Sequence, residues 1–376
     1  MKIVALGGAG QEGTTTVSLL AKDRRVSEIV IADRNLIAAN ALAGKLGAGR
    51  VRTAQIDVSD AAALKALIAD ADVVANFVGP YYRFGKPTLL AAIEAGVNYV
   101  DICDDVDATE ACLALDGAAK AADVTAVIGL GASPGLANVL ARRGVDLLDK
   151  AQDIEIRWQV SVTDVESMGT SAAMFHFFHA IDGDIPQFLD GALKLVPAYS
   201  GEEVVSFKSI GERHAFFTAH PEPVTIPRYI AGLRNVTCKG GILGLDEGVA
   251  ALRALGLTSN TPLDIDGAMI TPRRFAMALL DSLPPPDPLP EPLSALRVTV
   301  HGVKAGAPTS VEFDVMTPTR MSPITGIPTA VGALLVAQGN VKSPGVAAPE
   351  AVFDAAQFLE ELRPHGVEIA QTISAR

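Results

Sequence analysis

Apolar residues in the first third of the chain come in short runs separated by amphipathic stretches of about ten residues. The runs cover residues 2–6, 28–32, 72–78, 99–102 and 124–130, and residues 51–56 add an alternating segment. Continuous apolar strands alternating with helices are typical of a parallel sheet covered on both faces. The pattern therefore predicts an α/β fold with a doubly wound parallel sheet of six strands.

From residue 154 the pattern changes to strict alternation of apolar and polar positions. Alternating segments cover residues 154–162, 204–208, 215–219 and 236–239, and residues 296–303 and 310–316 read as a hairpin. Helical spacing covers 171–195, 246–255 and 271–283. Half-exposed strands of this kind predict an α+β domain with a mixed or antiparallel sheet, whose exposed face is a candidate homodimer surface.

Two apolar helices predicted over residues 329–339 and 351–363 resemble covering layers of the first domain. A chain of 376 residues also exceeds what one hydrophobic core usually serves. We therefore predict a first domain with the doubly wound sheet over residues 1–130 plus about 319–376, and an inserted α+β domain over about 131–318. A proline-rich surface connector is predicted over residues 284–292.

Composition narrows the class of protein. Hydrophobic residues make up 49%, charged residues 20%, and the formal charge is −12. This charge gives no help toward nucleic acid or an anionic membrane, so we expect neither partner. Three cysteines without a C-x-x-C motif, no leader before the first strand and no membrane-spanning run predict a cytoplasmic protein.

The first strand runs directly into a G-x-G-x-x-G motif that opens a helix. The motif consists of Gly8, Gly10, Gln11, Glu12 and Gly13 with Ala9 between them. In this strand–turn–helix context the first glycine permits a tight turn, the second lets backbone approach a pyrophosphate, and the third lets the helix press on the strand. The helix N-terminus would attract the diphosphate of a dinucleotide. The motif therefore predicts that the first domain is a dinucleotide-binding Rossmann domain and that the inserted domain serves substrate binding and dimerisation. The alternative is a glycine-rich turn that binds nothing.

The ends of the next strands carry the cofactor-selecting residues. Asp33 closes the second strand twenty residues after the glycine motif, where a carboxylate suits the ribose hydroxyls and favours NAD. Arg34 beside it would instead attract the 2′-phosphate of NADP, so both cofactors stay open, unless it is only a solvated residue. Asp57 and Val58 end the third strand and belong to the same predicted cofactor edge.

A turn with two aromatic residues follows the fourth strand. Its backbone at Val78, Gly79 and Pro80 is predicted to lie against the nicotinamide ring, and Asn76 just before it is a further predicted cofactor-binding residue. Tyr81 is a candidate proton shuttle and Tyr82 a candidate substrate contact, although either tyrosine could simply pack beneath the loop.

Two further loops lie at the predicted carboxyl edge. Asp101 is a candidate general base, and Asp104 in the same loop is a candidate partner for a substrate ammonium group, the alternative being solvated charge. Ser133, Pro134 and Gly135 precede a helix predicted from residue 136, with Ser133 as N-cap and Pro134 at its first position. The free amides of that helix are candidates for binding a substrate carboxylate, or the residues serve capping alone.

The second half of the chain offers fewer candidates. Arg228 is predicted either to hold a substrate carboxylate or to form an internal ion pair. His176 and His179 share a helix face, but no H-E-x-x-H pattern follows, so we expect no metal site.

Taken together, these motifs resemble the saccharopine dehydrogenase (saccharopine reductase) family, including its lysine 6-dehydrogenase and carboxynorspermidine dehydrogenase branches. The matching pieces lie along nearly the whole chain: residues 8–13, 32–34, 76–85 (from Asn76), 95–101, 130–138, 220–225, 325–328, 345–350 and 361–366. The resemblance implies a Rossmann domain completed by C-terminal helices, an inserted α+β domain, and NAD(P)-linked chemistry at a carbon bearing nitrogen in an amino acid or polyamine derivative. One departure is Ser133, where the family usually has Asp before Pro-Gly.

Three functions are compatible with these motifs. The first is an NAD(P)-dependent dehydrogenase in which Asp101 or Tyr81 takes the amine proton. The second is a non-catalytic dinucleotide-binding sensor. The third is an enoyl reductase acting on a C=C bond, in which a tyrosine would matter more than Asp101.

Overall fold

A computed structural model describes residues 1–47, 49–164, 172–282, 293–315, 321–341 and 343–375. Contacts divide the chain into two compact units. The first contains Met1–Arg143 and Ser322–Val367, and the second contains Gly144–Met321 and Glu368–Arg376. The proline-rich connector predicted over 284–292 lies outside the described residues.

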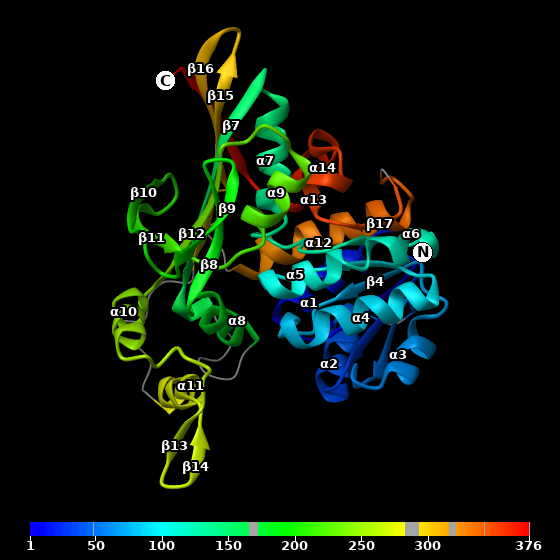
Figure 1. The fold of residues 1–376 in the computed structure, drawn as a ribbon. Coiled ribbons are helices and arrows are strands. Elements are labelled where there is room, and N and C mark those ends of the chain that lie inside the picture. Colours follow the sequence, from blue (N-terminus) through cyan, green and yellow to red (C-terminus); the bar gives the residue numbers. More distant parts are fainter. Residues whose placement is uncertain (48, 165–171, 283–292, 316–320, 342, 376) are drawn as a thin grey trace. The chain divides into compact units, whose positions relative to one another are not determined.

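The first unit is built on a seven-stranded parallel sheet in the order β17-β6-β5-β4-β1-β2-β3. Figure 1 labels β4 and β17 of this sheet. Its strands are β1 (Lys2–Leu6), β2 (Glu28–Asp33), β3 (Val51–Gln55), β4 (Val73–Asn76), β5 (Asn98–Asp101), β6 (Thr125–Val127) and β17 (Gly345–Ala347). Every residue of β4 is buried, as are all but the first of β1, because helices cover both faces. The predicted doubly wound sheet is confirmed, and its order reverses between β1 and β4, where such sheets bind ligands.

The helices of this unit connect the strands in the predicted alternation. They are α1 (Gln11–Leu20), α2 (Leu36–Leu46), α3 (Ala61–Ile68), α4 (Tyr81–Ala95), α5 (Val106–Leu113), α6 (Asp116–Ala121), α7 (Leu136–Asp146), which runs on into the second unit, α12 (Met321–Ala337), α13 (Pro349–Val352) and α14 (Ala355–Leu362). The C-terminal helix α12 packs on α1, since a Cβ at Gly326 would lie 2.7 Å from Thr15 Cβ. The chain therefore returns to complete this unit, as the residue pattern predicts for the C-terminal helices.

The second unit contains a nine-stranded mixed sheet whose main path is β10-β11-β12-β7-β15-β16-β18, with β8 and β9 at its side. The strands are β7 (Lys150–Ser161), β8 (Asp184–Leu189), β9 (Ala192–Pro197), β10 (Glu203–Phe207), β11 (Gly211–Phe217), β12 (Asn235–Leu243), β15 (Ser294–Lys304), β16 (Ala307–Val315) and β18 (Ile369–Ala375). A separate hairpin pairs β13 (Leu263–Ile265) with β14 (Ala268–Ile270). The helices are α8 (Ala172–Ala180), α9 (Glu222–Tyr229), α10 (Asp246–Ala254) and α11 (Pro272–Ser282).

Two expectations differ from this architecture. The single helix predicted over 171–195 is wrong, because α8 ends at Ala180 and the chain continues into the β8–β9 hairpin. Strand β18 pairs with β16 and so belongs to the second unit, whereas the residue pattern assigned all of 319–376 to the first. The first boundary also lies later along the chain, after Arg143 rather than residue 130.

Candidate active site

The glycine motif forms the turn between β1 and α1 at the point where the strand order reverses. Gly7 takes the left-handed conformation, with φ of +69°, and its N–H donates to the carbonyl of Ala32 at 2.7 Å. Helix α1 then begins at Gln11 with Gly10 as N-cap, and among the described residues no side chain caps it. Because the first amides of a helix have no partner within it, this end can hold an anion.

Close backbone packing requires glycine at two of the three motif positions, Gly8 and Gly13. A Cβ at Gly13 would lie 2.7 Å from Gly8 Cα, and one at Gly8 would lie 2.9 Å from Ala5 Cβ. At Gly10 a Cβ would have the carbonyl oxygen of Gly7 as its nearest neighbour, at 3.3 Å. The left-handed turn thus falls at Gly7, not at the predicted Gly8, whose freedom from a side chain serves packing. The glycine turn between β1 and α1 fits the diphosphate of a dinucleotide, since its open side lies at Gly10.

Asp33 ends β2 beside this glycine turn. Its carboxylate accepts from the N–H of Ala9 at 3.2 Å and from the N–H of Asn35 at 2.9 Å, so it links the glycine loop to the start of α2. The neighbouring Arg34 is exposed, as is Asp57 at the end of β3. Hydrogen bonds from Ser59 lower the pKa of Asp57, and the positive charges of Arg34 and Arg83 lower it further.

Val58, predicted with Asp57 at the cofactor edge, is only 8% exposed and packs in the main core cluster of this unit. Only its backbone is therefore suited to the predicted contact.

A buried polar network joins β4 and β5 at the same edge. Asn76 lies opposite Asp101 in the register of these strands, and both are fully buried. The Nδ2 of Asn76 donates to the hydroxyls of Tyr99 at 2.9 Å and Thr88 at 3.1 Å, while its Oδ1 accepts from the N–H of Val78 at 3.0 Å. Tyr99 in turn donates to Asp101 Oδ2 at 2.9 Å. Sequence reasoning missed Thr88 and Tyr99, although the spacing of Tyr99 and Asp101 in a strand puts both on one face.

The other oxygen of Asp101 fixes two loops. Oδ1 accepts from the N–H of Cys103 at 3.0 Å and from the N–H of Gly129 at 2.8 Å. Burial raises the pKa of Asp101 to about 6, against the opposing effect of these hydrogen bonds. The predicted base thus has a pKa suited to proton transfer at neutral pH, but its oxygens are engaged in holding the loops after β5 and β6.

Helix α4 follows the predicted nicotinamide loop. It begins at Tyr81, with Pro80 as N-cap. The loop approaches the glycine turn closely, because a Cβ at Gly7 would lie 3.2 Å from Val78 Cγ2. Gly79, like Val78 and Pro80, is half-buried. The structure therefore brings the predicted diphosphate and nicotinamide loops together.

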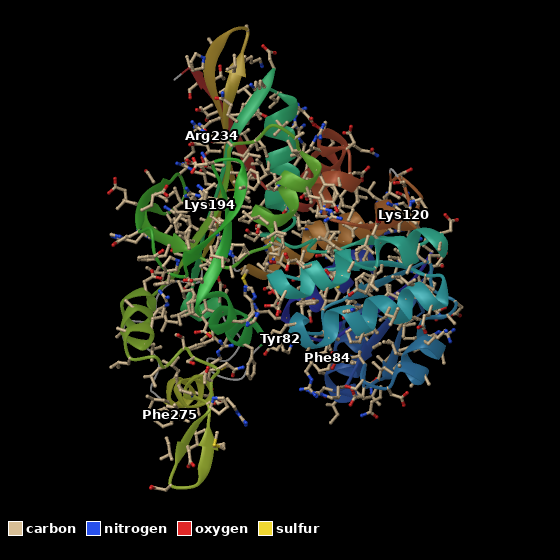
Figure 2. All side chains as sticks on the ribbon, viewed as in Figure 1. Tyr82, Phe84, Lys120, Lys194, Arg234 and Phe275 are labelled. Atoms are coloured by element: carbon tan, nitrogen blue, oxygen red, sulfur yellow. The ribbon has the colours of Figure 1, made fainter. Side chains whose placement is uncertain are left out.

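The two tyrosines of this loop differ in environment. Tyr81 is 6% exposed and its hydroxyl donates to the carbonyl of Asn76 at 2.9 Å. Burial and the nearby Asp101 raise its pKa, which keeps the phenol protonated. Tyr82 is 41% exposed, and its backbone N–H donates to the carboxylate of Asp105 at 3.0 Å (Figure 2). Tyr82 is thus the more accessible of the two.

The loop after β5 gathers carboxylates near these groups. Asp105 is 1% exposed and holds the start of α4 through Tyr82, whereas Asp104 is half-buried. The negative charge of Asp104 contributes to raising the pKa of Asp101, so the two lie within electrostatic reach. Such a concentration of carboxylates attracts a cationic ligand.

The segment at Ser133 and Pro134 is not the predicted helix start. Helix α7 begins at Leu136, and the N–H groups of Leu136 and Ala137 donate to the carbonyls of Gly131 and Ala132 at 2.8 and 2.9 Å. The N–H of Gly135 donates to Asn138 Oδ1 at 2.9 Å. These amides are occupied because the chain folds back on itself before the helix, which the N-cap pattern did not reveal.

Gly135 and the C-terminal segment complete this loop. A Cβ at Gly135 would lie 2.1 Å from the carbonyl oxygen of Gly131, and its φ is +126°. Asn138 donates through Nδ2 to Glu350 Oε2 at 2.9 Å, and both side chains are buried. Glu350, which the sequence offered only within a family-like motif, thus anchors the returning chain to the loop after β6.

Arg228 lies in the last turn of α9 in the second unit and is exposed. Its predicted role toward a substrate carboxylate stays a prediction. Within the described residues, no helix combines the length and apolar character that crossing a membrane requires.

Comparison with known proteins finds two family models that together match nearly the whole chain. Residues 3–127 match the family model of the saccharopine dehydrogenase NADP-binding domain, and residues 131–367 match that of the saccharopine dehydrogenase C-terminal domain. The carboxyaminopropylagmatine dehydrogenase of Synechocystis sp. is 25% identical over 399 residues, covering 98% of this chain and 96% of that protein. A trans-acting enoyl reductase of Mycobacterium bovis is 32% identical over 106 residues, which cover 28% of this chain and 25% of that protein.

The fold has a counterpart among solved structures. The saccharopine dehydrogenase (L-Glu forming) of Saccharomyces cerevisiae matches with a TM-score of 0.74 and 17% identity over all of both chains. The family models, which together span nearly the whole chain, carry the assignment. The chain belongs to the saccharopine dehydrogenase family, as its motifs predict, and is an NAD(P)-dependent oxidoreductase acting at an amine or imine carbon.

Proposed function

We propose that the substrate is a secondary amine built from an amino acid or a polyamine derivative. The observation that carries this proposal is the acidic loop after β5, where Asp101, Asp104 and Asp105 fall within five residues. Asp105 ties this loop to the start of α4, beside the predicted nicotinamide loop. A secondary amine is cationic at neutral pH, so these carboxylates favour its approach. The full-length likeness to a carboxyaminopropylagmatine dehydrogenase supports a polyamine derivative.

The dinucleotide is proposed to bind along the carboxyl edge of the first sheet. Gly10, Gln11 and Glu12 at the start of α1 would hold the diphosphate, and Asp33 would face the adenosine ribose. Backbone at Val78–Pro80 would support the nicotinamide. When bound, NAD(P) supplies the hydride acceptor of the reaction.

In the oxidative direction the substrate carbon loses a hydride and its nitrogen loses a proton, which leaves a C=N bond. Water then adds across this bond and splits it into a carbonyl compound and an amine. We assign Asp104 to contact the substrate ammonium group, and Asp101 to position the loop that carries Asp104. The sequence instead leads us to expect direct proton transfer by Asp101 or Tyr81. That role predicts a large loss of kcat in Asp101→Asn or Tyr81→Phe.

The choice between the two cofactors is proposed to favour NAD. The carboxylate of Asp33 would repel a 2′-phosphate, and it is fixed in place by two backbone amides. Arg34 and Arg83, both near Asp57, are the groups that would favour NADP. Thermal unfolding with 1 to 2 mM of each cofactor is the direct comparison, at roughly the millimolar upper end of enzyme KM values. We expect a larger rise in Tm with NAD.

The activity test follows reduced nicotinamide by absorbance in both directions. The substrates are saccharopine, carboxyaminopropylagmatine, carboxynorspermidine and lysine, each with NAD and with NADP. We expect turnover of a secondary amine and none of lysine, whose amines are primary. Absence of turnover with every secondary amine, or turnover of lysine alone, would contradict the proposed substrate class.

The contribution of Asp104 to substrate binding is tested with the amine that the enzyme turns over in this screen. Asp104→Asn removes one charge while keeping the shape, so we expect KM for the amine to rise about tenfold, equivalent to about 1.4 kcal/mol, with cofactor KM unchanged. Asp107→Asn is the matched control, because Asp107 is an exposed carboxylate three residues further on. Equal effects of the two variants would argue against a specific contact.

Exposed apolar residues of the second unit suggest an oligomeric state, and the cysteines suggest a cellular location. Exposed apolar residues gather on the β13–β14 hairpin and α11, among them Met269 (67% exposed) and Phe275 (54%; Figure 2), and we propose that they form a homodimer contact. Sedimentation of Phe275→Asp beside the unaltered protein tests this: the variant should be monomeric. The proposed cytoplasmic location is supported by the three cysteines, which are buried and form no disulfide in the structure.

A further inference from the structure

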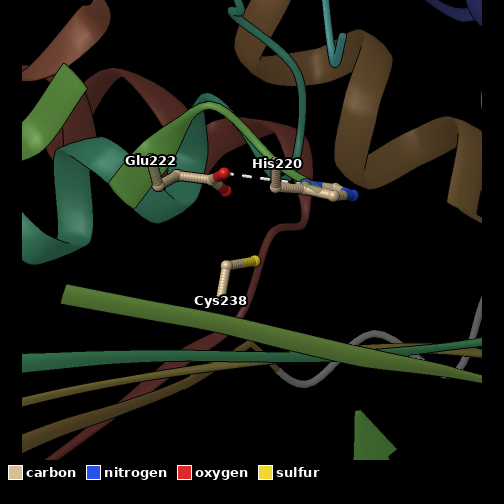
Figure 3. A group of neighbouring side chains, drawn as sticks. All are labelled: His220, Glu222 and Cys238. Atoms are coloured by element: carbon tan, nitrogen blue, oxygen red, sulfur yellow. Dashed lines mark ion pairs between the residues drawn. The ribbon is translucent and has the colours of Figure 1, made fainter. Parts of the chain in front are cut away.

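Three potential metal ligands of different chemistry lie together inside the second unit. His220 precedes α9, Glu222 is the first residue of that helix, and Cys238 lies in the middle of β12. One ligand atom from each of the three lies within 4.8 Å of the other two, and all three residues are buried. Figure 3 shows the thiol of Cys238 projecting from its strand toward the side on which the imidazole and the carboxylate lie.

The surrounding structure holds these groups in place. The N–H of Cys238 donates to Gln187 Oε1 at 2.9 Å, and Gln187 Nε2 donates to the carbonyl of Thr218 at 3.3 Å. This amide therefore links β12 to the segment that leads into His220. Helix α9 packs on β12 and β8, and a rigid frame of this kind is what a metal site requires.

The imidazole of His220 is confined by aromatic neighbours. Its ring centroid lies 5.2 Å from that of Trp158 and 5.4 Å from that of His176, and only 5% of the residue is exposed. Within the described residues, Nδ1 of His220 has no hydrogen-bond partner. A buried polar nitrogen without a partner costs stability, so an additional ligand at this atom would be favourable.

The separation of the two α9 groups fits a shared ion better than a direct bond. His220 Nδ1 and Glu222 Oε2 are 3.6 Å apart, which is too long for a hydrogen bond. Two ligands of one zinc ion, each roughly 2.0–2.2 Å from it, are separated by somewhat less than the sum of these distances. An ion between the two atoms therefore requires little movement of either side chain.

We propose that His220, Glu222 and Cys238 form a divalent transition-metal site that binds Zn²⁺. Nitrogen, carboxylate and thiolate donors together suit zinc, whereas Mg²⁺ and Ca²⁺ prefer oxygen ligands alone. Three protein ligands leave one tetrahedral position for water or another small ligand. On binding, the S–H bond of Cys238 breaks, its proton passes to solvent and a Zn–S bond forms. The sequence predicted no metal because these residues follow no linear motif.

The test uses full-length protein without an affinity tag. After treatment with a chelator and its removal, the protein is titrated with ZnCl₂ by calorimetry, in two buffers of different ionisation enthalpy. We expect one Zn²⁺ per chain, release of a proton, and a rise in Tm with added Zn²⁺. Titration with CoCl₂ should produce a thiolate-to-cobalt charge-transfer band, which reports the thiol directly in the unaltered protein.

Matched variants separate this site from adventitious binding. Cys238→Ala should weaken zinc binding at least about tenfold and abolish the cobalt–thiolate band, since loss even of the groups that orient a metal's ligands costs about 10- to 100-fold. Cys112→Ala is the control, because it removes an equally buried thiol in the first unit. No saturable zinc binding, a cobalt spectrum without the thiolate band, or equal zinc affinity in the two variants would overturn the proposal. If Cys238→Ala fails to fold, the cobalt spectrum of the unaltered protein decides.

Discussion

Replacing Asp101 by asparagine separates a positioning role from direct proton transfer. The carboxylate is fully buried, with Oδ1 accepting from Cys103 and Gly129 and Oδ2 accepting from Tyr99. Asparagine has the same shape, and its oxygen can keep both backbone amides. Its NH₂ group would then face the hydroxyl of Tyr99, which can accept. We therefore expect Asp101→Asn to fold with the loops after β5 and β6 in place.

The structure predicts both the size and the sign of the effect on stability. Burial raises the pKa of Asp101 from 3.8 to about 6. The folded protein therefore holds the proton more tightly than the unfolded chain, and stability falls as pH rises from about 4 to 6. The full difference corresponds to about 3 kcal/mol, of which about 1.4 kcal/mol is lost between about pH 5 and pH 8.

The assay is urea unfolding followed by circular dichroism, for the unaltered protein and Asp101→Asn across the same pH range. The stability of the unaltered protein relative to the variant should fall by about 1.4 kcal/mol from about pH 5 to pH 8. Asp107→Asn controls for general charge effects. A flat difference, or one that rises with pH, would refute the reasoning.

The same variant tests the chemistry. If Asp101 positions the loops, kcat at about pH 8 should stay within about tenfold of the unaltered value, because general acid–base groups contribute about 10²–10⁴. A loss of that larger size with stability preserved would instead support direct proton transfer by Asp101.

Further variants test other parts of the site. Gly13→Ala should destabilise by about 1–3 kcal/mol and weaken dinucleotide binding, because its Cβ would meet Gly8 backbone, whereas Gly44→Ala, with open space around it, should be neutral or stabilising in thermal unfolding. Tyr81→Phe removes one buried hydrogen bond and should cost about 0.5–1.5 kcal/mol with kcat nearly unchanged; a loss of about 10² in kcat would make Tyr81 an acid. Glu350→Ala removes the acceptor of a buried amide and should lower stability by about 1–3 kcal/mol, while Glu350→Gln should recover most of it.

Local patterns predicted the first unit well because each part depends on neighbouring residues. The apolar run before Gly8 and the helix after Gly13 specify a β–turn–α segment without long-range information, and β1 and α1 confirm it. By contrast, β17 has three residues and becomes a strand only by pairing with β6, more than 200 residues earlier. No window of sequence contains that pairing.

The second unit shows how turn residues can override helical spacing. The stretch 171–195 has apolar residues at helical intervals, yet Asp190 and Gly191 both take positive φ and join β8 to β9. Asp266 and Gly267 do the same between β13 and β14. Asp-Gly is a strong hairpin signal, and giving it priority over spacing would have predicted both hairpins.

For the candidate site, sequence identified the carboxyl edge but not what each polar residue does there. Asp101 was expected to be a base because an acid follows a strand at the ligand-binding edge. The strand register places it beside Asn76 and two residues from Tyr99. In the fold the carboxylate is a buried acceptor for three donors, which are the hydroxyl of Tyr99 and the N–H groups of Cys103 and Gly129. Its pKa remains near neutrality because burial outweighs those hydrogen bonds. Asp101 therefore affects activity through the loops that it holds. Its substitution should change substrate KM more than it changes the pH dependence of the chemical step.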